Sequence, residues 1–262
     1  MKKKPLILVV NDDGIFAPGI KALIEVVRVL GEVIVVAPNS PQSAQGHALT
    51  ISDPIRIHPV HTFEGIEAHE TSGTPVDCVK LAKHVVLKGR KIDLCVSGVN
   101  HGSNAAVNIL YSGTMSAAME ASIEGIPSVG FSLNDFSFDA DFEPCKAFIK
   151  QICSFMLQNK LKMRLLNVNF PKLQAAEIKG FKVCRQAEAR WVEDFQKGTD
   201  PSGRTYYWLT GKFVNLEPDA VDTDVWAIQN GYISVVPSQH DLTDYDGVKE
   251  LKENNFEKLL NG

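Results

Sequence analysis

Residues 6–14, LILVVNDDG, decide how the fold of this chain is interpreted. The run Leu6–Val10 is continuously apolar, which is typical of a strand buried on both faces of a parallel sheet. Two adjacent carboxylates, Asp12 and Asp13, follow where this strand meets its loop. Open α/β sheets bind their ligands at the carboxyl ends of their strands. The stretch therefore predicts both a sheet and the edge at which a ligand is expected.

Strand and helix patterns alternate on the C-terminal side of this stretch. Further predicted strands are short apolar runs over 33–37, 92–96, 128–133 and 165–170. Predicted helices carry apolar side chains three or four positions apart and cover 20–30, 74–86, 114–124 and 145–157. We therefore predict an α/β fold with a doubly wound, mostly parallel, Rossmann-like sheet in a three-layer α/β/α arrangement.

The last third of the chain has a different pattern. Residues 178–237 lose the helical period and gain β-prone aromatic runs such as Tyr206–Trp208, whereas the final residues are charged and amphipathic. We predict an α/β catalytic core over 1–177, a β-rich C-terminal appendage over 178–245 and a closing helix over 246–262.

Composition excludes several classes of protein and partner. The 27 basic and 31 acidic residues give a net charge of −4, which argues against long nucleic acids as the main partner. The first apolar run ends at Asn11 after five residues, too short for a signal peptide or a membrane span, so no membrane association is expected. Five scattered cysteines without a CxxC pair indicate thiols in a reducing compartment, and we expect a cytoplasmic protein.

The adjacent carboxylates require a compensating group. Held about 4 Å apart, two such charges repel by about 4 kcal/mol at an effective dielectric constant near 20, so a proton, a partner or a cation is needed. Ser43 and Asn100 lie in loops that follow other predicted strands and add neutral oxygens at the same sheet edge. This donor set suits Mg²⁺ or Mn²⁺. The alternative is that Asp12 or Asp13 only caps the turn before the next helix.

A second candidate feature is Ser112, which precedes a helix rich in Ala and Met. Ser112 is a good N-cap, and a helix N-terminus binds phosphate readily, although an ordinary capped helix has the same pattern. Gly14 and Gly19 are followed by Ile20 and Lys21 where a P-loop needs Lys and Ser or Thr. The sequence contains no GxGxxG after the first strand and no HExxH, which weakens the dinucleotide and zinc-hydrolase alternatives.

Several ordered motifs together resemble those of the survival protein E (SurE) family of metal-dependent nucleotidases. The resemblance extends over nearly the whole chain, through Leu8–Ile15, Ala17–Ile20, Val35–Pro38, Gln42–Ser43, Gly46–Thr50, Gly73–Val79, Ser97–Asn100, Tyr111–Thr114, Ala117–Glu120, Asn167–Asn169, Asp200–Pro201, Gly203–Arg204, Tyr232–Val236 and Asp241–Thr243. Two positions depart from the family pattern. Asn39 stands where an acid is usual, and Ala44 stands where glycine is common, which could alter the loop that carries Ser43.

The resemblance implies a complete site. One divalent metal ion per subunit, Mg²⁺ or Mn²⁺, is expected on Asp12, Asp13, Ser43 and Asn100, with the two aspartates as catalytic residues. Phosphate contacts are expected from Asn104, Ser112, Gly113 and Thr114. The resemblance also implies a homodimer or homotetramer in which residues 178–245 act as an oligomerisation arm.

We therefore expect a 5′-nucleotidase, a phosphoric monoester hydrolase that converts nucleoside 5′- and 3′-monophosphates to nucleoside and phosphate by direct attack of a metal-activated water. Asp241 and His101 are candidates for the general acid, and Tyr111 or Trp191 for base recognition. Two alternatives stay open. One is a phosphatase that forms a phospho-aspartate on Asp12, although Gly14 and Ile15 stand where such enzymes place a second acid. The other is a nucleotide-binding module without turnover.

Overall fold

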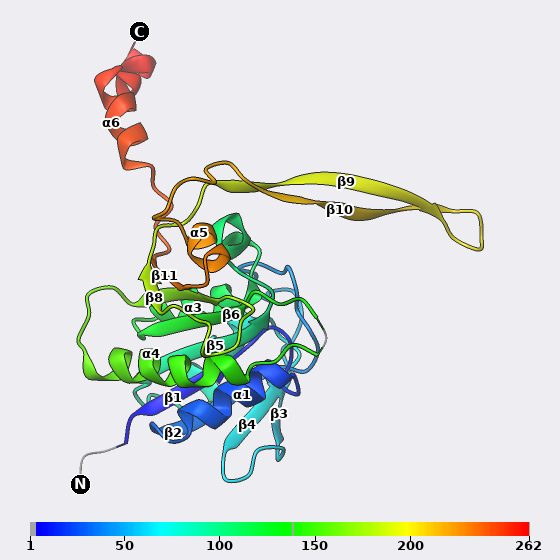
Figure 1. The fold of residues 1–262 in the computed structure, drawn as a ribbon, viewed down its shortest axis with the longest axis vertical. Coiled ribbons are helices and arrows are strands. Elements are labelled where there is room, and N and C mark those ends of the chain that lie inside the picture. The colour runs from blue at the N-terminus through cyan, green and yellow to red at the C-terminus, as the bar shows by residue number, and fades with distance from the viewer. Residues whose placement is uncertain (1–3, 138, 262) are drawn as a thin grey trace.

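The central sheet has nine strands in the part of the chain that this computed structural model describes, residues 4–137 and 139–261. Their order is β3-β4-β2-β1-β5-β6-β7-β11-β8 (Figure 1). Their bounds are β1 Leu6–Val10, β2 Glu32–Pro38, β3 Ile57–Val60, β4 Glu67–Thr71, β5 Leu94–His101, β6 Ser128–Leu133, β7 Leu165–Phe170, β8 Phe181–Val183 and β11 Ile233–Ser238. Neighbours pair in parallel except β3 with β4 and β7 with β11, so the sheet is mostly parallel as predicted.

Helices cover both faces of the sheet. Alternate residues of β1 point to opposite faces, and Ile7 and Val9 join a core with α1 (Pro18–Val27) and α4 (Lys146–Gln158). Leu8 and Val10 join a separate core with α2 (Pro75–Leu81) and α3 (Gly113–Ile123). This arrangement confirms the predicted three-layer α/β/α fold.

Local signals fix where the helices begin. Thr74 caps α2 in a capping box with Asp77, and Pro75 occupies the first turn, as the sequence indicated. The predicted helix over 74–86 is not uniform, because residues Ala82–Val86 continue it as a π-helical turn. Shorter helical segments are the 3₁₀ helices η2 (Ala106–Leu110) and η3 (Glu143–Cys145) and the α-helix α5 (Asp224–Gln229).

The C-terminal third differs in extent from the predicted appendage. Within residues 178–245, β8 and β11 belong to the central sheet, and only the hairpin of β9 (Ala189–Thr199) and β10 (Thr205–Asn215) stands away from it (Figure 1). The expected closing helix forms as α6 (Tyr245–Glu253), followed by a 3₁₀ turn over Phe256–Asn261. No residue of α6 is buried, and the helix projects from the body of the chain. Residues 1–3, 138 and 262 of the predicted segments lie outside the described residues.

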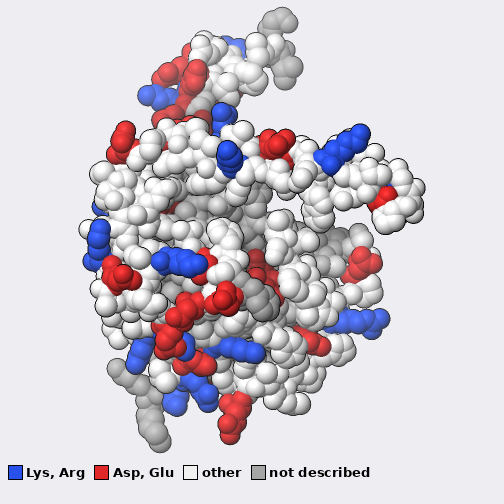
Figure 2. Space-filling model, turned by 45° about the vertical axis from the view of Figure 1, so that its right-hand side comes forward, with Lys and Arg blue, Asp and Glu red and all other residues white. Residues whose placement is uncertain are grey.

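The remaining general features agree with an ordinary globular chain. All five cysteines are free and buried, at Cys78, Cys95, Cys145, Cys153 and Cys184. No helix among the described residues is long and apolar enough to cross a bilayer. Acidic and basic side chains are interspersed over the face presented in Figure 2.

Candidate active site

A cavity of about 770 Å³ opens at the carboxyl edge of the parallel strands. Its lining brings together all four residues predicted to hold a metal, namely Asp12, Asp13, Ser43 and Asn100. Asp12, Asp13 and Ser43 come from the loops after β1 and β2, and Asn100 from the carboxyl end of β5; they converge because β1 lies between β2 and β5 in the sheet. Ile15 N donates to Pro38 O over 2.9 Å, which ties the loop after β1 to the end of β2.

Asp12 is a buried carboxyl group with only 5% of its surface exposed. Its Oδ1 accepts a hydrogen bond from the hydroxyl of Thr114, at the start of α3. Burial and the adjacent Asp13 carboxylate raise the pKa of Asp12 to about 6, and the hydrogen bonds from Thr114 only partly oppose this rise. In the chain alone, the charge on Asp12 is therefore poorly compensated.

Asp13 is oriented by His101. The two groups approach to 3.4 Å between His101 Nδ1 and Asp13 Oδ2, and each side chain is 20% exposed. The imidazole also meets the ring of Phe142 edge-on, with 4.9 Å between ring centroids. Its Nε2 is buried without a hydrogen-bond partner in the described structure. The ring is therefore held in place with Nδ1 toward Asp13.

Asn100 presents an oxygen to the cavity. Its Nδ2 donates to the carbonyl oxygens of His101 and Gly102 over 3.0 and 2.8 Å, which leaves Oδ1 without a role in those contacts. The pairing of β5 with β6 is irregular between Ser97 and Asn100. Such irregularities redirect side chains next to functional sites.

Ser43 lies on an exposed loop that is tied to the first strand. Gln42 N donates to Asp12 O over 2.8 Å, which places the neighbouring Ser43 beside the carboxylates. The next residue, Ala44, has a φ of +58°. This left-handed conformation costs a residue with a Cβ about 1 kcal/mol, so the loop keeps a glycine-like backbone at a modest cost.

The four expected phosphate contacts divide into two pairs. Asn104 and Ser112 line the cavity, whereas Gly113 and Thr114 are directed at Asp12. A Cβ on Gly113 would lie 2.6 Å from Asp12 Cβ, so only glycine permits this close approach of α3 to β1. The helix N-terminus that the sequence suggested as a phosphate site thus faces a carboxylate of the protein itself.

A buried amide network supports Asn104, and the sequence analysis did not foresee it. Asn169 Oδ1 accepts from Asn104 N over 2.7 Å, and Asn167 Nδ2 donates to Asn104 O over 2.8 Å. Asn104 Nδ2 donates to Ser132 Oγ over 2.8 Å. The signal was present in β7, where two asparagines at alternate positions interrupt an otherwise apolar strand. Because both amides are buried and bonded, this loop has one favoured position.

The structure separates the two candidates for the general acid. His101 lines the cavity, but Asp241 lines a second cavity of about 810 Å³. There Asp241 accepts hydrogen bonds from Thr243 N, over 2.9 Å, and from the hydroxyl of Tyr245. These bonds lower the pKa of Asp241 to about 2. The aromatic candidates Tyr111 and Trp191 both line the first cavity.

The donor set fits a hard divalent cation. Two carboxylates and the oxygens of Ser43 and Asn100 face one space, and none of the described residues that line it is Lys or Arg. No group of three His, Cys, Asp or Glu side chains in the described chain has the arrangement of a metal centre. A cation here therefore depends on neutral oxygens and water as well as on the aspartates.

Known proteins of one family are similar to this chain over nearly its whole length. Residues 7–193 match the family described as Survival protein SurE. A protein from Christiangramia forsetii named 5′-nucleotidase SurE is 60% identical over 253 residues, which cover 95% of this chain and 96% of that protein. A protein of the same name from Alkaliphilus metalliredigens is 42% identical, over 96% of this chain and 99% of that protein. The crystal structure of the SurE protein from Aquifex aeolicus superposes with a TM-score of 0.82 at 40% identity, covering 96% of this chain and 100% of that one.

Proposed function

Because the chain belongs to the survival protein SurE family, we propose that it hydrolyses nucleoside 5′- and 3′-monophosphates to nucleoside and inorganic phosphate with the help of a divalent metal ion. Nucleotidase activity follows from the family and from relatives named 5′-nucleotidase. The observation that carries the metal-dependent form is the pair of carboxylates in a cavity whose described lining contains no Lys or Arg. A phosphate dianion would be repelled there unless a cation compensated the charge.

We assign the metal ligands to Asp12, Asp13, Ser43 and Asn100, with one Mg²⁺ or Mn²⁺ per subunit. When bound, a divalent cation supplies charge for the phosphoryl oxygens and acidifies water into a nucleophile. The protein's part is to hold the ligands still. Thr114 fixes Asp12 and His101 fixes Asp13, and such outer contacts orient the ligands of metal sites.

Asp12 is poorly suited to act as a nucleophile. It is almost wholly buried, and one of its oxygens already accepts the Thr114 hydroxyl. A phospho-aspartate would require that oxygen or its neighbour to reach phosphorus. This geometry supports direct attack of water over the covalent alternative.

The phosphate is expected to lie against Asn104 and Ser112, with the N–H groups of Gly113 and Thr114 contributing through the positive end of α3. Of the two candidate general acids, we retain His101, because it lines the same cavity as the aspartates. Protonation of the leaving nucleoside oxygen from this position needs no group from another part of the fold.

We also propose that the protein is a cytoplasmic homodimer or homotetramer. The hairpin exposes Tyr206, Tyr207, Trp208 and Leu209, and α6 has an apolar side that no described element buries. Exposed apolar surface of this kind is typical of interaction sites. The five unpaired cysteines suit a reducing compartment. Light scattering of the purified protein tests the assembly.

The deciding experiment measures release of inorganic phosphate from 5′- and 3′-nucleoside monophosphates with Mg²⁺, Mn²⁺ or EDTA. We expect release that requires a metal and an acid-quenched protein that carries no phosphoryl group. A stable or trapped phospho-protein would favour the covalent mechanism. Tight nucleotide binding without release, in protein shown to be folded, would favour the binding module.

A further inference from the structure

The hairpin forms one wall of the cavity that holds the aspartates. In the antiparallel register Trp191 pairs with Phe213, Glu193 with Gly211 and Phe195 with Leu209, so these residues share one face of the hairpin. Four of them, Trp191, Glu193, Leu209 and Gly211, line the cavity. One face of the hairpin is therefore turned toward the proposed substrate site.

The base of the hairpin is fixed on the side of this cavity. Trp191 Nε1 donates to Asn108 Oδ1 over 2.8 Å, which joins β9 to the middle of η2. The ring of Phe213 packs against Trp191 with 5.7 Å between ring centroids. Glu193 lies two residues beyond Trp191 on β9. The contacts of Trp191 therefore also fix the position of Glu193 relative to η2.

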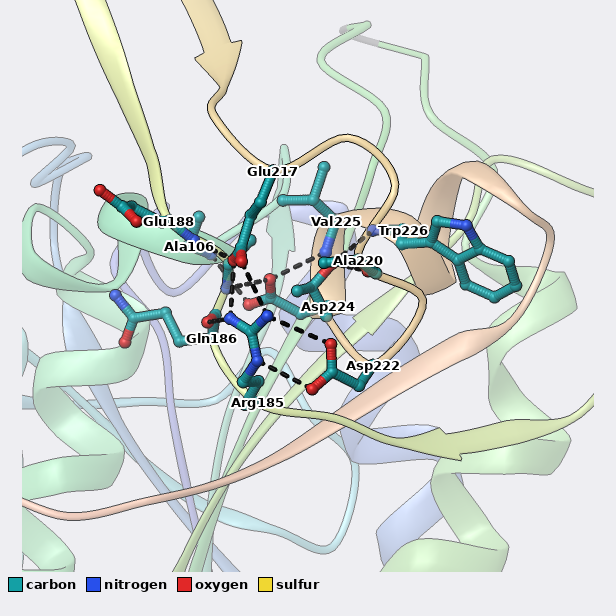
Figure 3. A network of polar contacts seen from close by, with 12 residues as sticks. Ala106, Arg185, Gln186, Glu188, Glu217, Ala220, Asp222, Asp224, Val225 and Trp226 are labelled. Atoms are coloured by element: carbon teal, nitrogen blue, oxygen red, sulfur yellow. Dashed lines mark hydrogen bonds and ion pairs between the residues drawn. The ribbon is translucent and has the colours of Figure 1, made fainter.

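Buried and charged contacts beneath the hairpin also fix its base (Figure 3). Asp224 accepts from Ala106 N and Ala187 N, each over 2.9 Å, and so joins η2 to the segment that enters β9. Arg185 binds Glu217 through two bonds of 2.7 Å and also binds Asp222. These contacts hold together the segment that precedes β9 and the segment that follows β10.

Gly211 allows the backbones of β9 and β10 to lie close together beside Glu193. A Cβ at this position would lie 2.7 Å from the carbonyl oxygen of Val192, so a side chain does not fit. The cross-strand neighbour of Glu193 therefore has no side chain. Within the described chain, no hydrogen bond or ion pair uses the Glu193 carboxylate, although it lines the cavity. Glu193 is a carboxylate with free acceptor oxygens beside open space.

The two sides of the cavity differ in chemistry. The sheet edge has the metal-ligand set with Asn104 and Ser112, whereas the hairpin side consists of Trp191, Leu209, Thr210, Gly211 and the single charge of Glu193. A carboxylate repels a phosphate and accepts hydrogen bonds without donating any. It therefore favours the orientation in which the phosphate faces the aspartates and the uncharged nucleoside faces the hairpin.

We propose that Glu193 is a specificity-determining residue, whose carboxylate accepts hydrogen bonds from donor groups of a nucleoside bound in the cavity beside the hairpin. This inference rests on the proposed function. Two parts of a nucleoside offer such donors: the N–H groups of a base, above all N1–H and the 2-amino group of guanine, and the hydroxyls of the ribose. Trp191 and Leu209 supply apolar surface on either side of the polar contact.

The test compares Glu193→Gln with Asp194→Asn. Gln keeps the size of the side chain and removes its charge. Asp194 is the matched control, because it carries the same charge one residue along, on the opposite face, and its only side-chain hydrogen bond in the described structure is from Phe195 N. For each protein, KM and kcat are measured at saturating metal with GMP, IMP, AMP and 2′-deoxy-GMP. Dissociation constants of the corresponding nucleosides are measured by calorimetry without turnover.

We expect Glu193→Gln to raise KM and the nucleoside dissociation constant by about 10- to 100-fold for ligands with the recognised donor, with kcat changed little, and Asp194→Asn to stay within about twofold. Loss for GMP, 2′-deoxy-GMP and their nucleosides, but not for IMP or AMP, identifies the 2-amino group, and loss that extends to IMP identifies N1–H. Loss for every ribonucleoside, but not for the deoxy compounds, identifies the ribose.

Two results would overturn parts of this account separately. If the unchanged protein is active and Glu193→Gln has the same KM values and nucleoside affinities, the role of Glu193 is wrong and the proposed function stands. If the unchanged protein releases no phosphate from any monophosphate, the proposed function fails. The nucleoside affinities then still decide whether Glu193 recognises a donor, because they require no turnover.

Discussion

Two cavities of the described structure are similar in size but differ in chemistry. They measure about 770 and 810 Å³ and share a wall formed by η2 and the start of α3. Asn108, Tyr111 and Ser112 face the first cavity, and Ile109 and Leu110 face the second. Only the first has adjacent carboxylates and aligned neutral oxygens.

The difference follows from the direction of the strands. The first cavity lies where parallel strands end, and their loops deliver polar groups to one edge. The second includes Pro237 and Ser238 of β11, which runs antiparallel to β7 and pairs these residues with Leu166 and Leu165 at its start. Cavity volume alone therefore does not identify a site in this fold.

The largest expected effect is the loss of activity when an aspartate of the first cavity is replaced. Asp13→Asn or Asp12→Asn should lower kcat/KM by more than about 100-fold, because loss of a metal ligand exceeds the 10- to 100-fold typical of an outer contact. Calorimetric titration with Mn²⁺ checks that metal affinity falls in parallel. Full activity in either folded variant would contradict the assigned metal site.

The next effect concerns stability and pH. The folded-state pKa of Asp12 is raised from 3.8 to about 6, so the native state binds its proton more tightly than the unfolded chain. The stability that this tighter proton binding contributes is fully present below pH 4. It is lost as the pH rises to 6, and the loss is about 3 kcal/mol.

In EDTA, the free energy of unfolding of the unchanged protein should therefore fall, relative to that of Asp12→Asn, by about this amount between pH 4 and 7. Denaturant titrations at several pH values measure the difference. Mg²⁺ or Mn²⁺ at pH 7 should stabilise the unchanged protein and not the variant. A difference independent of pH would show that Asp12 is not the group responsible.

A smaller effect compares the two sides of α3. Gly113→Ala places a Cβ 2.6 Å from Asp12 Cβ and should reduce kcat/KM by about tenfold through displacement of that ligand. Ser116→Ala, which faces the second cavity and removes only a bond to Ser112 O, should stay within about twofold. Equal losses would mean that α3 acts through its stability and not through Asp12.

The smallest expected effect is at Asp241. Asp241→Asn should leave kcat/KM within about twofold, because the carboxylate lines the second cavity and contacts Thr243 and Tyr245. A steady-state assay beside light scattering checks both activity and assembly. A large loss of kcat with the assembly unchanged would bring Asp241 back as the general acid.

Most of the sheet edge could be predicted from sequence. Continuous apolar runs located β1, β2, β5, β6 and β7, and the polar segments that follow three of these runs contain Asp12, Ser43 and Asn100. The short strands β8 and β11 escaped, because their pattern does not differ from that of the hairpin that separates them in the chain.

Other features of the site depend on contacts between segments that are distant in the sequence, and no local sequence pattern indicates them. Thr114 has the sequence context of a phosphate contact, but the proximity of α3 to β1 turns its hydroxyl to Asp12. Glu193 looks like an ordinary charge on an exposed strand. Its place in the cavity wall depends on the contact between Trp191 and Asn108, 83 positions apart.

The distribution of the buried thiols has a practical consequence for folding studies. Cys78 lies in α2, Cys95 in the central strand β5 and Cys153 in α4, so each layer of the fold contains one. Burial raises the pKa of Cys95 to about 12 and that of Cys78 well above its usual value, so these thiols react only after local opening. Alkylation of these native thiols followed by mass spectrometry would report the opening rate of each layer, without an engineered cysteine.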